Sequence, residues 1–431
     1  MNAPLALEQA PPISVPLRFL LTAPLFGMLA ATLLLIGGDE VLATRWSPLL
    51  LALTHLVGLG VLTMAMCGAL LQLLPVLVGA QIAQPLPIAA VCHGGLVLGT
   101  LLLAGGFVAG SGAMFAVAAG VLAIALGGFI SVVGSALWRA DRPDASTRGM
   151  RLALLGLLAT LLLGLALALG HAGTGLPLWR GTGTDLHLAF ALAGWVGTLV
   201  VAVAYQVVPM FQMTAPYPQS LRAWLAPAIG VVLLVAAALS AWAPQSQSLA
   251  WPVLALPLAV FAIATLGLLA HRRRKVGDAS LAFWRLGLVA LLAAIAVGAA
   301  SRFFATDLAM QLAVTLFIAG FALSAVCAML YKIVPFLVWL HLQQRISASA
   351  AARHRIFPPN MKALLPEPRA RAHFGLQLAA LVLLVAAAFW PFLVRTAAAL
   401  WFAAFAVLAR NLWTVLARYR VECERIDGCG T

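Results

Sequence analysis

The chain has 431 residues, of which 64% are hydrophobic and only 9% are charged, and its mean hydropathy is +1.05. This composition excludes a soluble globular protein and predicts an integral membrane protein. The formal net charge of +14 would suit nucleic acid in a soluble protein, but in a membrane protein the position of the basic residues decides their role.

Long apolar runs follow one another along the whole chain. A spanning helix needs about 20 mainly apolar residues, and twelve runs qualify. No β-barrel alternation is visible, so we predict an all-α polytopic membrane protein with one transmembrane domain over 1–431. The predicted spans are 18–37, 49–79, 85–107, 112–138, 150–170, 186–213, 222–242, 250–271, 281–301, 309–339, 373–392 and 394–417.

The basic residues alternate between the two sides of this predicted bundle. With a cytoplasmic N-terminus, the outer segments hold only Arg45, Arg180, Arg302 and Arg395, and nearly all the other basic residues lie in inner segments. This bias predicts cytoplasmic N- and C-termini in a bacterial inner membrane. The basic charge therefore indicates topology, with the lipid bilayer and its anionic lipids as partner and no nucleic acid.

One long apolar segment design occurs three times. His55 opens the first copy and His187 the second, and the copies end at Pro75, Pro209 and Pro335, which are 134 and 126 residues apart. Self-similarity at a near-constant spacing indicates a repeated unit. We therefore predict twelve transmembrane helices in three pseudo-threefold four-helix units, at about 18–138, 150–271 and 281–417.

A polar residue lies three positions before each of these prolines, and a tyrosine precedes it in two copies. Proline inside a helix cannot donate to the preceding turn, which frees a carbonyl there. We predict a polar ring near the inner face, serving either helix packing or the entry of protons or water. Its side chains are Gln72, Tyr205, Gln206, Tyr331 and Lys332.

Ionisable groups inside a membrane are costly and indicate function. No acidic residue lies in the middle of a predicted span, which argues against an ion-coupled transporter. His55 and His187, in contrast, lie near the outer ends of two repeated segments, close to His171 and Met310. Imidazole and thioether groups bind heme iron and copper. We predict an outer metal centre held by His55 and His187, with His171 or Met310 as a replacement ligand.

An arginine precedes each repeated segment on the outer side: Arg45, Arg180 and Arg302. Guanidinium groups bind carboxylates in bidentate fashion, so these residues suit heme propionates. The alternative to a role in binding heme is that the three arginines, and His55 and His187 at the starts of their helices, anchor the helices at the membrane interface. No Cys-x-x-Cys-His motif is present, which favours a b-type heme.

Of the remaining histidines, His93 on the third predicted helix is expected to be a hydrogen-bonded core histidine, and the other four to be solvated or interfacial. His271 and His341 end predicted helices, His354 belongs to the basic inner segment 340–372, and His373 is grouped with that segment at its end. We expect this segment to be a mobile surface loop.

Twelve helices, cytoplasmic termini and the position of His55 on the second helix resemble subunit I of the heme-copper oxidases. In that family the second-helix histidine binds the low-spin heme. His187 lies on the sixth helix, where the family has a copper ligand, but nearer the outer end. The spans 222–242 and 309–339 lack the family's other histidines, and no His-Pro-Glu-Val-type motif occurs. The resemblance implies a divergent relative without the oxygen-reducing binuclear centre. NnrS-like heme-copper membrane proteins are a looser comparison, because their His-rich second-helix signature is absent.

The leading hypothesis is a membrane protein that binds heme, or copper, near its outer face and acts in electron transfer, metal handling or the response to a small gas. A cytochrome or a quinol would be its electron donor, and an enzymatic role would be that of an oxidoreductase. The alternatives are a permease for a neutral small solute and a heme-free scaffold or assembly protein. A visible absorption spectrum distinguishes the first from the others.

Overall fold

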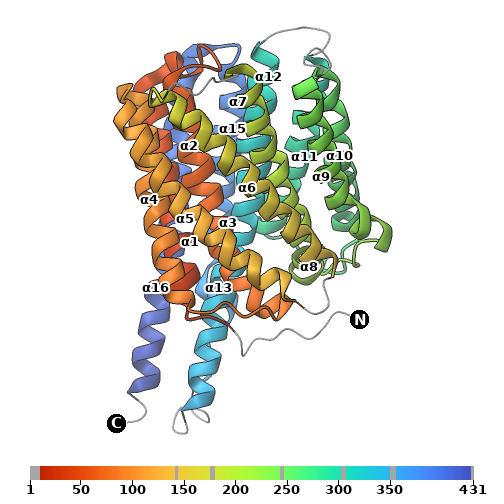
Figure 1. Ribbon diagram of the computed structural model, residues 1–431. Helices are drawn as coiled ribbons and strands as arrows, with labels where there is room; N and C mark the ends of the chain where they lie inside the picture. Colours follow the sequence, from red (N-terminus) through yellow and green to blue (C-terminus); the bar gives the residue numbers. More distant parts are fainter. Residues whose placement is uncertain are drawn as a thin grey trace.

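The computed structural model describes residues 10–140, 144–174, 180–242, 247–301, 307–349 and 356–428. Every regular element in these ranges is a helix, which confirms the predicted all-α fold, and the helices form one bundle (Figure 1). The principal helices are α1 (Ser14–Gly37), α2 (Pro48–Val57), α3 (Met64–Leu73), α4 (Pro85–Ala109), α5 (Gly112–Trp138), α6 (Ala145–His171), α7 (Arg180–Ala189), α8 (Thr198–Gln212), α9 (Gln219–Trp242), α10 (Gln247–Ala270), α11 (Ala279–Ala300), α12 (Asp307–Thr315), α13 (Leu323–Ala348), α14 (Met361–Leu364), α15 (Glu367–Ala387) and α16 (Val394–Asp427).

Eleven helical stretches within the described ranges are long and apolar enough to cross a membrane. The sequence predicts twelve, and the difference lies in α10, which contributes the shorter apolar stretch Ala255–Ala270. The whole of α10 has 24 residues and packs between α9 and α11. Helices of this length and composition match a hydrocarbon core of ~30 Å, so the chain is a multi-pass membrane protein.

Each of the three repeated segments forms one long helix that contains a π-helical stretch. The stretch Gly58–Thr63 joins α2 to α3, Phe190–Gly197 joins α7 to α8, and Leu316–Ala322 joins α12 to α13. π-helical turns are rare and frequently occur at functional sites. His55 and His187 both lie three residues before their π-helical stretch, so they correspond in their place along the helix, although they are 132 residues apart and the prolines are 134 apart.

Equivalent residues of these three long helices meet around one axis. They border a void of about 70 Å³, and the first helix contributes Ala65, Met66, Ala69, Leu70 and Leu73. Adding 134 and then 126 to each of these numbers gives the lining residues of the other two helices. These are also the spacings of the three prolines, so an approximate threefold axis relates the three helices. We call this space the axial void.

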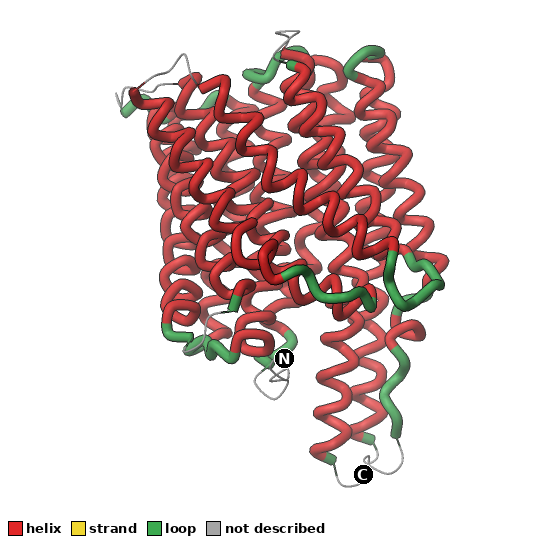
Figure 2. The backbone as a smooth tube through the Cα atoms, turned by 90° about the vertical axis from the view of Figure 1, so that its right-hand side faces the viewer, coloured by secondary structure: helices red, strands yellow, loops and turns green. Residues whose placement is uncertain are grey.

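α13 and α16 extend beyond the other helices at the end of the bundle where α1 begins, as two views show (Figures 1 and 2). We call this the terminal end and the opposite one the distal end. α16 has 34 residues, or ~51 Å at 1.5 Å per residue, which exceeds the ~30 Å of a hydrocarbon core.

The expectation of a mobile loop over 340–372 is wrong for the part of it that is described. α13 continues to Ala348, α14 follows, and α15 begins at Glu367. Ile356 and Leu364 are buried, since these apolar side chains have more to gain from packing under the projecting helices than from water.

Candidate functional site

A cavity of about 650 Å³ lies among α2, α4, α5, α6, α7, α12, α15 and α16, toward the distal end of the bundle. Its wall consists mainly of Leu, Val, Ala and aromatic side chains. The volume falls within the ~300–1,000 Å³ typical of small-molecule and cofactor sites, where a few polar groups set orientation. We call this space the distal cavity.

His55 on α2 and His187 on α7 both line the distal cavity and face each other. Their ring centroids are 6.2 Å apart and their planes differ by 22°. The structure therefore brings together the two residues that the sequence nominated as metal ligands.

Both imidazoles are fixed by their Nδ1 atoms. His55 Nδ1 donates to the carbonyl of Leu51 at 2.7 Å, and His187 Nδ1 donates to that of Thr160 at 3.0 Å. Because a carbonyl only accepts, Nδ1 carries the hydrogen and the neutral ring keeps its lone pair on Nε2. Among the described residues, neither Nε2 has a hydrogen-bond partner, and both histidines line the cavity. Metal-binding histidines generally have this arrangement, because the bond at one nitrogen orients the other.

Gly164 on α6 lets the ring of His187 approach closely. A Cβ at this position would lie 2.9 Å from His187 Cε1 and 3.4 Å from Nδ1. Such a contact would force the imidazole to move, and the hydrogen bond to Thr160 with it. Gly164 is therefore a positioning residue for His187.

The donor set fits heme better than a bare metal ion. In the described ranges, no three His, Cys, Asp or Glu side chains come together as a metal site. Protein-bound zinc or copper needs about three or four ligands, whereas heme iron takes one or two axial ligands from the protein. Each imidazole would offer a heme iron one nitrogen, Nε2, because its Nδ1 is already hydrogen-bonded to a carbonyl.

His171 lies at the edge of the same cavity, within an aromatic cluster. Its ring stacks on Phe115 at 4.9 Å and meets Phe107 edge-on at 5.6 Å, while Phe107 stacks on His55 at 5.4 Å. His171 is thus next to the histidine pair through Phe107. Met310 on α12 is half-buried and also lines the cavity, one turn before Ala313, which replaces histidine in the third unit.

Of the three arginines expected to bind heme propionates, the structure describes the side chain of one. Arg45 lines the distal cavity, forms an ion pair with Asp185 on α7 and lies over the Trp46 ring at 4.6 Å. Arg180 is the first residue of α7, but its side chain is not among those described, and Arg302 lies outside the described residues. A ligand carboxylate at Arg45 would share the guanidinium with Asp185.

Two of the polar residues expected to form a ring near the inner face bind helix-capping aspartates instead of one another. Gln206 Nε2 donates to Asp144 at 3.0 Å, and Lys332 Nζ donates to Asp278 at 2.7 Å. Both aspartates are N-caps, accepting from backbone N–H groups at the starts of α6 and α11. Each pair therefore joins a long helix to the first helix of its own unit.

The other three polar residues are buried separately. Tyr205 donates from its hydroxyl to the carbonyl of Leu221 at 3.3 Å, and the hydroxyl of Tyr331 accepts from Asn411 at 3.1 Å. Gln72 is buried, and its Oε1 has no partner. In the described residues these groups make no hydrogen bonds with one another, and the axis at their level is apolar. The expected ring is therefore a set of separate contacts.

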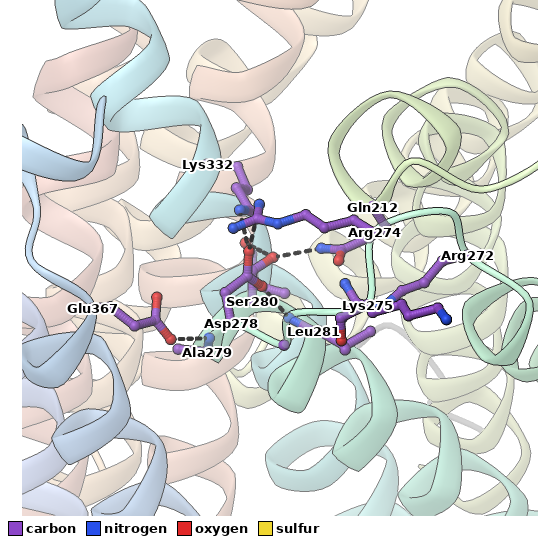
Figure 3. A network of polar contacts seen from close by, with 12 residues as sticks. Gln212, Arg272, Arg274, Lys275, Asp278, Ala279, Ser280, Leu281, Lys332 and Glu367 are labelled. Carbon is purple, nitrogen blue, oxygen red and sulfur yellow. Dashed lines mark hydrogen bonds and ion pairs between the residues drawn. The ribbon is translucent and has the colours of Figure 1, made fainter. Parts of the chain in front are cut away.

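The Asp278 contacts form the centre of a wider network at the terminal end (Figure 3). Arg274 lies 3.6 Å from its carboxylate, and Leu281 N–H donates to it at 3.0 Å. Burial alone would raise the pKa of Asp278, but the hydrogen bond and charge of Lys332, with these two contacts, lower it below the ordinary 3.8. Asp278 therefore stays ionised and holds three chain segments together.

Sequence reasoning missed His373. It is fully buried on α15, not solvated, with Phe283 at 5.1 Å and Tyr331 at 5.6 Å between ring centroids. Neither ring nitrogen has a hydrogen-bond partner. The helical spacing of His373, Gln377 and Leu384, all buried, was the available signal.

Comparison with known proteins assigns no family. No protein-family model matches the chain, and no curated protein is significantly similar to it. The fold and site define a multi-pass helical membrane protein whose large apolar cavity contains two oriented imidazoles.

Proposed function

We propose that the protein binds one b-type heme in the distal cavity, with His55 and His187 as axial ligands. The observation that carries this proposal is the pair of imidazoles that line a cavity of about 650 Å³, with ring centroids 6.2 Å apart and each Nδ1 fixed by a carbonyl. Heme supplies one-electron chemistry and an affinity for small gases. The function is then electron transfer, metal handling or gas response in a divergent relative of heme-copper oxidase subunit I.

The residues around the cavity have distinct roles in this proposal. The carbonyls of Leu51 and Thr160 keep each imidazole in the tautomer that presents Nε2. The apolar wall excludes water and receives a flat hydrophobic group, and Arg45 neutralises a carboxylate at the edge. His171 or Met310 replaces one ligand if the pairing differs. The site fits a copper ion alone less well than heme, because copper needs more protein ligands than two imidazoles.

Oxygen reduction to water is not part of the proposed function. That reaction needs copper opposite heme iron, and copper there needs about three imidazoles. Only His55, His171 and His187 line the described part of the cavity, and the heme engages two of them. A reduced quinol or cytochrome is the proposed electron donor, and its oxidation with sustained oxygen consumption would contradict this assignment.

A permease for a neutral solute gains no support from the contacts at the terminal end. Gln206 and Lys332 are engaged by helix caps, and the axis between the long helices presents hydrocarbon to a polar solute. A heme-free scaffold would make the same helix contacts, so the spectrum decides between it and the heme protein.

The terminal end is proposed to face the cytoplasm of a bacterial inner membrane. The basic inner segments support this orientation, because Lys and Arg are retained on the cytoplasmic side. Reporter fusions after Arg148 and Arg274 should report a cytoplasmic location. A fusion after Gly173 should report a periplasmic one, and the reverse pattern would invert the orientation.

The test of heme binding is the absorption spectrum of protein purified from heme-sufficient cells. The wild type should have a Soret band at roughly 410–430 nm. His55→Ala and His187→Ala should abolish or shift it. His271→Ala is the matched control, because His271 is exposed at the end of α10 and bonds only its own helix. A spectrum that all three variants leave unchanged would remove His55 and His187 from the site.

A further inference from the structure

The axial void is bordered only by hydrocarbon. Its lining comes from α3, α8 and α13, with Leu20 and Trp284 beside them, and no polar atom of the described residues borders it. Five residues from each long helix face it in threefold-equivalent positions. The void is therefore a feature of the repeat itself, created where three helices cannot bring side chains fully to their common axis.

One layer of the lining borders the empty space most directly. Ala69, Val203 and Met329 are equivalent in the three units, and each is half-buried although its helix neighbours are buried. Their accessible surface faces the axis, since all three line the void. This layer determines the size of the space, and its three side chains differ in volume.

The axial void follows the distal cavity along the same three helices. The cavity wall ends at Thr63, Val196 and Ala319, and the lining of the void begins at Ala65, Leu199 and Ala325. The two linings are two residues apart along the first helix, three along the second and six along the third, or ~3, ~4.5 and ~9 Å at 1.5 Å per residue. A molecule in the void would thus lie close to the inner boundary of the cavity.

The chemistry of the void selects its occupant. Water needs two to four polar partners in a buried site and finds none here, so apolar cavities of this kind stay dry and bind benzene or xenon. The volume of about 70 Å³ suits a small molecule better than a lipid chain or a cofactor ring. Uncharged diatomic gases and xenon combine small size with low polarity.

We infer that the axial void is a binding site for one small apolar molecule of the size of a diatomic gas. The inference does not depend on heme, because it rests on the void and its hydrocarbon lining. With heme in the distal cavity, the void would hold a gas molecule one step inward of the cofactor.

Xenon is the probe, measured by xenon-129 NMR with the purified full-length chain in detergent. The wild type should show one saturable site above the uptake of protein-free micelles. Ala69→Leu adds bulk to the half-buried layer and should lower xenon affinity by ~10-fold or more. Met329→Ala enlarges the same layer and should retain or strengthen binding. Ala116→Leu makes the Ala69 substitution on the exposed face of α5 and should behave like the wild type.

Xenon uptake that is not saturable, or that Ala69→Leu leaves unchanged, would overturn the inference. Val203→Leu replaces Ala69→Leu if the latter does not fold, since the two residues are equivalent across the axis. The measurement is independent of heme: a colourless protein that binds xenon would retain this site while the proposed heme function fails.

Discussion

The two ends of the same long helices use polar side chains in different ways. At the distal end, His55 and His187 each lie three residues before a π-helical stretch, and both line an open cavity. At the terminal end, Gln206 and Lys332 are also equivalent, but both bind helix-capping aspartates. Repetition alone therefore does not indicate a site. Polar groups paired within the chain stabilise the fold, and those left open in a cavity are available to a ligand.

The largest expected effect separates the two ends in one pair of variants. His187→Ala should reduce heme affinity by ~10–100-fold or more, because it removes an axial ligand, and should change the stability of the heme-free protein little. Gln206→Ala should leave heme affinity unchanged and lower the apparent unfolding temperature. Heme titration measures the heme affinity of each variant, and thermal unfolding measures its unfolding temperature. Loss of heme binding in Gln206→Ala would break the comparison.

Gly164→Ala sharpens the account at the distal end. The added methyl would lie 2.9 Å from His187 Cε1, so the ring must shift from its hydrogen bond with Thr160. We expect a shifted Soret band and ~10-fold weaker heme binding, at the low end of the ~10–100-fold that losing such an orienting bond typically costs. Gly120→Ala is the control, because nothing lies within 4 Å of its added Cβ. Equal spectra for the two variants would remove the positioning role of Gly164.

Asp278→Asn tests the terminal end. The substitution removes the negative charge beside Lys332 and leaves one amide oxygen for the two donors, Lys332 Nζ and Leu281 N–H, at a site where the side chain of Asp278 is 10% exposed and that of Lys332 is 21% exposed. We expect a loss of about 1–3 kcal/mol in stability, seen as a lower unfolding temperature with unchanged heme affinity. Asp144→Asn should cost less, because its partner Gln206 is neutral. Equal losses in the two variants would show that the Lys332 charge adds nothing.

The same carboxylate predicts a pH dependence of stability. The folded-state pKa of Asp278 is lowered from its ordinary 3.8. Its contribution is therefore present above that value and is lost as the pH falls through the folded-state pKa. Thermal unfolding below about pH 4 should fall more steeply with pH in the wild type than in Asp278→Asn.

Much of the fold could be predicted from the sequence, because apolar run length and proline spacing are local signals. The three units and the facing of His55 and His187 follow from the repeat, since equivalent positions meet across a symmetry axis. The partners of the inner polar residues could not be predicted in the same way, because each contact joins residues far apart in the chain. One signal was available: Asp-Ala-Ser occurs at both Asp144 and Asp278, marking the two caps.

Two further features escaped the sequence analysis for physical reasons. The π-helical stretches are as apolar as the helices on either side of them, so their composition does not mark them in the sequence. His373 was assigned to a loop because the charged residues around it hide the start of α15. A helix begins where capping and packing allow, and charges in its first turns face water without ending it.

The most direct measurement is a spectral titration of heme into purified wild-type protein, with iron counted per chain. The account predicts one heme per chain at saturation and a Soret band at roughly 410–430 nm, dependent on both His55 and His187. Protein that stays colourless with ample heme, and shows no spectral change beyond that of detergent micelles, would contradict it.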